Sequence, residues 1–273
     1  MISSFLLALR EGLEAALIIG VVLGTLRKIK QTHFSGSVWF GVGTAAFLSA
    51  VAALILNALG ASFSGRTEEI FEGLVMLLAA GLLTWMIFWM RDQSRTIQTA
   101  LEDDVQQAAQ SGGQRALFMV AFLAVLREGI ELALFLTAAA AVSNQQDTLF
   151  GAILGLAGAA LLGWVLFATT VRLNLKRFFQ ITSVLLILFA AGLVAHGVHE
   201  LNEVGWIPAV IEHLWDINPI LDEKSTPGLM LKALFGYNAN PSLTEVLAYF
   251  LYFGAVMLGL RRDTHLSAAA HHA

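Results

Sequence analysis

One charged motif occurs twice in an otherwise apolar chain: Arg-Glu-Gly-Leu-Glu at residues 10–14 and Arg-Glu-Gly-Ile-Glu at residues 127–131. The second copy begins 117 residues after the first, and small residues spaced by four accompany both. These stripes are Ala8, Gly12, Ala16, Gly20 and Gly24, and then Gly129, Ala133, Thr137 and Ala141. Residues spaced by four share a helix face, and small ones let helix backbones approach closely within a membrane. We therefore expect both motifs on closely packed helices of an internal repeat.

The composition is that of an integral membrane protein. Of 273 residues, 57% are hydrophobic and 13% are charged, and the mean hydropathy is +0.73. Soluble domains carry about 25% charged residues, so a water-soluble domain is excluded. The absence of cysteine excludes disulfides, thiolate zinc sites and thiol catalysis. A net charge of -4 leaves no general basic surface, and we expect no nucleic-acid partner.

A transmembrane helix needs about 20 mostly apolar residues. Seven segments meet this length: 2–26, 36–59, 69–90, 117–142, 149–171, 178–199 and 242–260. We therefore predict an all-α membrane protein with seven transmembrane helices.

The basic residues predict the orientation, because short loops rich in Lys and Arg stay in the cytoplasm. One side holds eleven: Arg27, Lys28, Lys30, Arg91, Arg95, Arg115, Arg172, Lys176, Arg177, Arg261 and Arg262. The other side holds three, Arg66, Lys224 and Lys232. This distribution predicts an N-terminus outside and a C-terminus inside.

The motif repeat then divides a single transmembrane domain. We assign repeat one to residues 1–90 and repeat two to residues 116–199, joined by a cytoplasmic loop at 91–115. An outer loop at 200–241, a seventh helix at 242–260 and a cytoplasmic tail at 261–273 follow. Because each repeat holds three spans, the two cross the membrane in opposite directions. Inverted-topology repeats of this kind are typical of transporters.

The acids of the motifs are the candidate metal ligands. Glu11 and Glu14 share one helical face, as do Glu128 and Glu131, and all four lie about mid-span. Arg10 and Arg127 each precede the second acid of a motif by four residues, which favours an ion pair. Such a pair could merely lock two helices together, but that leaves one glutamate of each motif unexplained. Four carboxylates suit hard cations such as iron, manganese, magnesium or calcium.

A second group of polar residues lies toward the predicted outer surface. It comprises Glu68, Glu69, Glu72, His196, His199, Glu200, Glu203 and Glu245. His196, His199, Glu200 and Glu203 recur at helical spacings of three and four, so one face presents imidazoles and carboxylates together. We interpret the group as an outer access path that concentrates cations. The alternative is a solvated acidic surface with capping histidines.

On its two motif copies, the chain resembles the oxidase-dependent iron transporter family, marked by a repeated Arg-Glu-Gly-Leu-Glu motif in membrane helices. The resemblance spans all seven predicted helices, and Ile130 is a conservative departure from the motif. It implies that Glu11, Glu14, Glu128 and Glu131 are iron ligands. For a bacterial member it implies the inner membrane, with a periplasmic iron-binding protein and a haem peroxidase as partners.

Our prediction is therefore an iron permease that imports Fe2+ or Fe3+ from periplasm to cytoplasm through the glutamate site. Iron is the transported substrate, membrane lipid surrounds the chain, and neither a permanent cofactor nor an enzymatic activity is expected. A transporter of another divalent cation is the alternative. An intramembrane metal-dependent enzyme is a weaker one, because His-x-x-His-Glu at residues 196–200 is not the His-Glu-x-x-His of zinc peptidases. A receptor that binds without transport would not explain the excess carboxylates.

Overall fold

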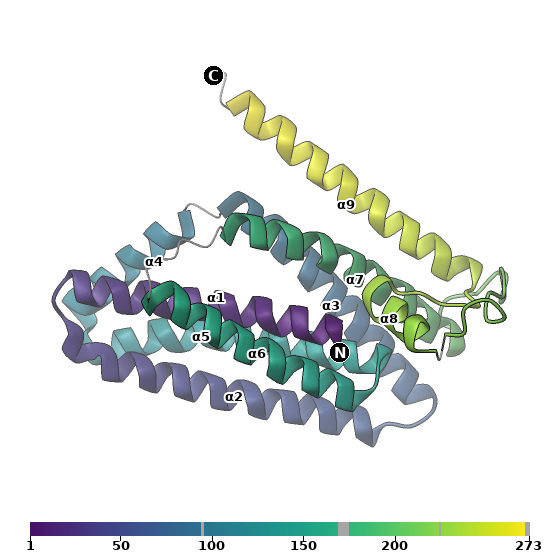
Figure 1. Ribbon diagram of the computed structural model, residues 1–273, viewed down its shortest axis with the longest axis horizontal. Helices are drawn as coiled ribbons and strands as arrows, with labels where there is room; N and C mark the ends of the chain where they lie inside the picture. Colours follow the sequence, from purple (N-terminus) through teal and green to yellow (C-terminus); the bar gives the residue numbers. More distant parts are fainter. Residues whose placement is uncertain (94–95, 169–174, 224, 271–273) are drawn as a thin grey trace. The chain divides into compact units, whose positions relative to one another are not determined.

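The computed structural model is helical and contains no strand among the residues that it describes, 1–93, 96–168, 175–223 and 225–270 (Figure 1). Some basic residues used for the orientation lie outside the residues whose side chains are described: Arg91, Arg95, Arg172, Lys176, Lys224 and Arg262. The end of the fifth predicted span, residues 169–171, also lies outside them.

The long helices follow the predicted apolar segments. They are α1 (Ile2–Lys28), α2 (Ser35–Ser62), α3 (Arg66–Gln93), α5 (Gly113–Val142), α6 (Gln145–Ala168), α7 (Leu175–Glu203) and α9 (Leu243–Ala270). Shorter elements are η1 (Thr32–Phe34), α4 (Thr96–Gln107), the π-helical turn η2 (Ala108–Gly112) and α8 (Thr226–Phe235). The long helices continue past the predicted apolar cores because helical hydrogen bonding does not stop where the apolar side chains end.

Five of the helical segments are long and apolar enough to cross a membrane, within the described part of the chain. They are Thr32–Ser62, Arg66–Met90, Gln145–Phe167, Arg177–Glu203 and Leu243–Arg261. Helices α1 and α5, with 27 and 30 residues, have the length but each carries an arginine and two glutamates near its middle. The prediction of an all-helical membrane protein is thus confirmed, whereas the count of seven spans stays a prediction.

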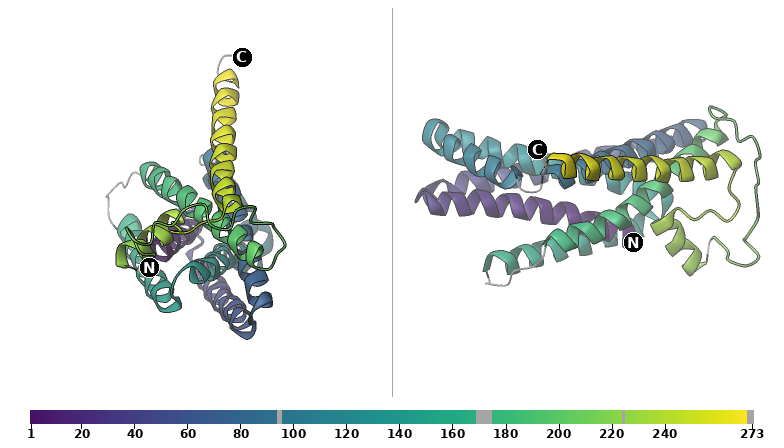
Figure 2. Two further views of the ribbon diagram at one scale, coloured as in Figure 1. Left: turned by 90° about the vertical axis from the view of Figure 1, so that its right-hand side faces the viewer. Right: turned by 90° about the horizontal axis from the view of Figure 1, so that it is seen from above.

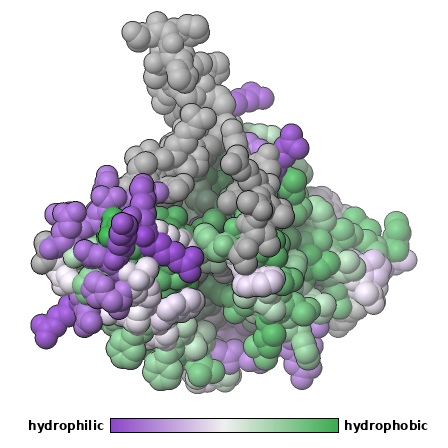
Figure 3. All heavy atoms as spheres, turned by 60° about the vertical axis from the view of Figure 1, so that its left-hand side comes forward, coloured by the Kyte–Doolittle hydropathy of each residue, from purple (hydrophilic) through white to green (hydrophobic). Residues whose placement is uncertain are grey.

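Large apolar side chains are exposed along the candidate spans, as expected for helices in lipid. Phe40, Phe47 and Leu54 of α2 are 70%, 67% and 70% exposed, and Trp164 of α6 is 65% exposed. Apolar side chains cover much of the face in Figure 3.

The chain forms two compact units, each built from both sequence repeats. The first comprises residues 1–62, 90–140 and 144–182, and the second comprises residues 63–89, 141–143 and 183–273. The first two long helices of each repeat therefore belong to the first unit. Most of the third helix of each repeat, residues 66–89 of α3 and 183–203 of α7, belongs to the second unit, together with α8 and α9.

In the first unit, α1 and α6 run side by side in the same direction (Figure 2). A Cβ atom on Gly155 would lie 2.5 Å from the carbonyl oxygen of Phe5, and one on Gly12 would lie 2.7 Å from Cβ of Ala159. Only glycine permits such an approach, so the small-residue stripe of α1 packs on α6.

Helices α2 and α5 form a corresponding pair. A Cβ on Gly41 would lie 2.7 Å from the carbonyl oxygen of Phe118, and one on Gly129 would overlap the side chain of Ser49. The first helix of each repeat thus packs on the second helix of the other repeat. At one end of the unit, Val22, Leu26 and Leu117 are fully buried in a cluster that α4 covers.

In the second unit, α3 packs against both α7 and α9. Gly73 and Gly197 face each other closely, and Arg66 Nη2 donates to the carbonyl oxygen of Val204, so α3 and α7 are antiparallel. The hydroxyls of Thr84 and Tyr252 lie 2.8 Å apart, and a Cβ on Gly259 would lie 2.7 Å from the ring of Phe88, so α3 and α9 are parallel.

Helix α8 lies within the predicted outer loop and was not predicted. Its sequence nevertheless contains the usual residues that begin and end a helix. Ser225 caps the first turn by accepting a hydrogen bond from the backbone N–H of Gly228, and Pro227 occupies the first turn. Gly236 ends the helix with a left-handed φ of 68° and packs against the backbone of Gly192 on α7.

Candidate metal centre

The two motifs lie near the middles of α1 and α5, where helical spacing produces the same internal ion pair twice. Nε of Arg10 donates to Oε1 of Glu14 at 3.0 Å, and Nε of Arg127 donates to Oε1 of Glu131 at 2.8 Å. Both are the predicted pairs between residues four apart.

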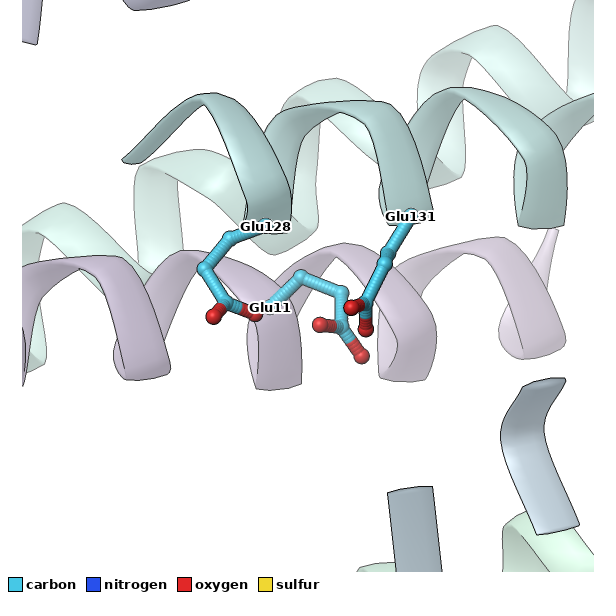
Figure 4. Close-up of side chains that lie close together, drawn as sticks. All are labelled: Glu11, Glu128 and Glu131. Atoms are coloured by element: carbon cyan, nitrogen blue, oxygen red, sulfur yellow. The ribbon is translucent and has the colours of Figure 1, made fainter. Parts of the chain in front are cut away.

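Three motif glutamates converge between α1 and α5. One carboxylate oxygen from each of Glu11, Glu128 and Glu131 lies within 4.8 Å of the other two. The three residues are 1%, 7% and 6% exposed. Figure 4 shows Glu11 on α1 reaching the two acids of α5, so both copies of the repeat contribute to one cluster.

Most oxygens of this cluster have no partner among the described residues. Both carboxylate oxygens of Glu11, and Oε2 of Glu128 and of Glu131, are buried without a hydrogen bond there. A buried carboxylate without a partner is expensive, and neighbouring like charges add to that cost. The arrangement therefore favours an added cation or proton.

Glu14 does not belong to this group of three. Its carboxylate is paired with Arg10, whose side chain is fully buried and whose Nη2 donates to Sδ of Met90 at 3.1 Å. The side chain of Arg127, in contrast, is 38% exposed. The two motif copies are thus alike in sequence but different in surroundings, and Met90 carries no sequence signal that points to this role.

The cluster has the dimensions of a single metal site. Two oxygens on opposite sides of an ion, each at about 2.0–2.4 Å, are separated by about 4–5 Å, so three oxygens that all lie within 4.8 Å of one another can contact one ion. Three carboxylates supply hard oxygen ligands and leave further positions of an octahedral ion for other ligands.

The predicted outer residues all belong to the second unit. Glu68 and Glu203 are exposed, and Glu69, Glu72, His199 and Glu200 are half-buried. His196 is buried, with Nδ1 3.0 Å from the carbonyl oxygen of Gly192.

Glu245 is buried and held by its neighbours. Its carboxylate accepts two hydrogen bonds from Nδ2 of Asn238, at 2.9 and 3.1 Å, and lies 3.4 Å from Nδ1 of His199. Sequence reasoning missed Asn238, which precedes Glu245 by seven residues in a loop. Within the described part of the chain, the outer acids and histidines do not form a group of three closely spaced ligands.

Comparison with known proteins places this chain in a family. The model of the iron permease FTR1 family matches residues 1–262. The chain belongs to this family. Its members are permeases, which confirms the prediction of a multi-pass membrane transporter rather than an enzyme.

Several similar proteins carry the name ferrous iron permease EfeU. The one from Shigella sonnei is 39% identical over 272 residues, covering 97% of each chain. The one from Yersinia pestis is 37% identical over 250 residues, covering 91% of this permease and 89% of the relative. No solved structure matches the chain.

Proposed function

We propose that this permease imports iron and that Glu11, Glu128 and Glu131 bind the ion during its passage. The observation that carries the proposal is the convergence of three buried carboxylates from both motif copies, with most of their oxygens unpaired. The family and the names of the relatives support iron as the substrate.

The arginines set the charge of the centre. Arg127 holds Oε1 of Glu131, which leaves Oε2 for the metal. Arg10 holds Glu14, which we assign to positioning rather than to direct ligation in this arrangement. Two cations beside four carboxylates make iron binding weak enough for release, as conduction requires.

The packing directions support an inverted repeat, and the distribution of basic residues is the reason why we start α1 outside. With seven alternating spans, α1 and α6 cross in one direction, and α2 and α5 cross together in the other. The parallel pairs in the first unit, and the antiparallel pair of α3 and α7 in the second, agree with this alternation. Inward movement of a cation then gains about 2.3 kcal/mol per charge for each 100 mV of membrane potential.

We place the protein in a bacterial inner membrane, as a single permease domain with its exposed and half-buried outer acids as the access path. Glu68, Glu69, Glu72, Glu200 and Glu203 attract cations there. Ferrous iron is the substrate that the names of the relatives favour. A periplasmic iron-binding protein and a haem peroxidase would act upstream of this path.

Uptake of radiolabelled iron into proteoliposomes that hold only this protein tests the proposal. Ferrous iron under ascorbate is compared with ferric citrate, and excess manganese or magnesium tests for another substrate. We expect saturable ferrous uptake that Glu11→Gln abolishes and that Glu212→Gln, an exposed acid outside the centre, preserves. Undiminished uptake by Glu11→Gln would refute the central site. A preference for manganese over iron would refute the substrate.

A further inference from the structure

A cavity of about 330 Å³ lies within the first unit, between the beginnings of α2 and α5. The two helices run in the same direction, because Gly41 packs on Phe118 and Ser49 packs on Gly129, so both begin at this cavity. No residue of either charged motif lines it, and the carboxylate centre therefore does not explain it. The lining residues are Gly36, Ser37, Phe40, Gln114, Arg115 and Phe118.

Arg115 gives this cavity a positive charge that no acid compensates. It is the one charged residue of the lining, its side chain is exposed, and it forms no salt bridge within the described part of the chain. The N-terminal ends of two long helices add partial positive charge at the same place. The cavity therefore favours an anion.

The polar groups around Arg115 suit a phosphate in particular. The planar guanidinium group of arginine matches the oxygens of a phosphate, to which it can donate two parallel hydrogen bonds. The hydroxyl of Ser37 and the side-chain amide of Gln114 supply further donors. A Cβ on Gly36 would meet nothing within 4 Å, so the space beside the first turn of α2 is open to a ligand.

The remaining lining indicates that the phosphate belongs to a lipid. The rings of Phe40 and Phe118 have their centroids 5.6 Å apart, and Phe40 and its neighbour Trp39 are 70% and 56% exposed. These residues lie near the start of the candidate span Thr32–Ser62, the level at which aromatic side chains meet lipid head groups. An anion with attached acyl chains would contact Arg115 and the exposed rings together, whereas a free anion would contact only Arg115.

We propose that this cavity binds the head group of an anionic phospholipid, with Arg115 as the counter-charge of the phosphate. A zwitterionic lipid suits the cavity less well, because no carboxylate lines it to pair with an ammonium group. The basic residues place this end on the predicted cytoplasmic side, where the leaflet carries anionic lipids. The bound lipid joins the beginnings of α2 and α5, a role separate from iron binding.

Native mass spectrometry of the purified full-length chain, freed of bound lipid in detergent, tests the proposal. Phosphatidylglycerol is titrated against phosphatidylcholine with identical acyl chains. We expect phosphatidylglycerol to bind about tenfold more tightly, the usual worth of a hydrogen bond between charged groups.

Three variants locate the preference. Arg115→Gln should abolish it, and Gly36→Leu should abolish it by filling the cavity without meeting a neighbouring atom at its Cβ. Arg27→Gln is the matched control and should retain the preference, because Arg27 is an exposed arginine of the same predicted membrane side that does not line the cavity.

Several outcomes would overturn the proposal. Equal binding of the two lipids by the unaltered chain, or a preference that survives Arg115→Gln, would exclude recognition of an anionic head group here. An equal loss in Arg27→Gln would indicate attraction by the general surface charge instead of this cavity. Glycerol phosphate binding as tightly as phosphatidylglycerol would exclude a lipid as the source of the phosphate. If Arg115→Gln does not elute as a folded protein on size-exclusion chromatography, Gly36→Leu decides the question.

Discussion

Glu11 is the most deeply buried of the three clustered glutamates, and its burial is costly for stability. It is 1% exposed, and both of its carboxylate oxygens are without a hydrogen bond among the described residues. Burying a carboxylate costs several kcal/mol even after relaxation of the protein. In the proposed function, binding of a cation offsets this cost, and we therefore assign Glu11 to transport rather than to folding.

The two arginines should differ in their effect on stability. Replacing Arg10, whose side chain is fully buried, by Gln leaves Glu14 without its partner. We expect a loss of about 3–5 kcal/mol of unfolding free energy, the usual effect of breaking a buried ion pair. Arg127→Gln should cost clearly less, because Arg127 is 38% exposed and water replaces part of the pair. Thermal unfolding of the two variants in the same detergent measures the difference, and equal losses would contradict this explanation.

The residue-scale prediction from sequence succeeded where helical spacing alone decides the geometry. It anticipated both ion pairs and the shared face of Glu128 and Glu131. It could not show that Glu14 stands apart from the group of three, because the two motifs have the same charged residues. What differs is the surroundings of Arg10, including Met90 from a helix distant in sequence.

At the scale of elements, close approach of α1 and α6 depends on glycines that leave no room for a methyl group. The small-residue stripe predicted this kind of packing. The partner could not be predicted, because a stripe specifies that a helix is approached closely but not which helix approaches it. That the first helix of each repeat packs on the second helix of the other repeat is visible only in the folded unit.

Gly155→Ala should disturb this interface. Its Cβ would lie 2.5 Å from the carbonyl oxygen of Phe5, a backbone atom that cannot rotate away. We expect α1 and α6 to separate locally, with a loss of about 1–3 kcal/mol as in other overpacked interiors. Gly24→Ala on α1 is the matched control, because nothing lies within 4 Å of its Cβ position. A melting temperature that falls only in the first variant supports the interface, and equal behaviour of the two would argue against it.

At the scale of the whole molecule, composition alone identified a helical membrane protein, and apolar length located the long helices. The charged motifs explain why α1 and α5 are not among the five clear candidate spans, although each is long enough to cross. Helix α8 was missed because its ten residues are too few to cross a membrane, and spanning length was the criterion that located the helices. Capping by Ser225 and Gly236 was the available signal.

The absence of native cysteine makes the predicted orientation directly measurable. Thr32→Cys and Ser64→Cys place single thiols at exposed positions beyond the two opposite ends of α2. With the N-terminus outside, a membrane-impermeant maleimide should label Ser64→Cys in cells with a permeable outer membrane. Thr32→Cys should be labelled only after the inner membrane is opened. The reverse pattern would require the opposite orientation.

The central claim is that iron binds among Glu11, Glu128 and Glu131. Anomalous diffraction at the iron absorption edge, from crystals of the iron-loaded protein, tests it most directly. The account predicts an iron peak between α1 and α5 with carboxylate oxygens from all three residues as ligands, and no peak there in Glu11→Gln. Iron bound only by the outer histidines and acids, with none between the two motif helices, would contradict it.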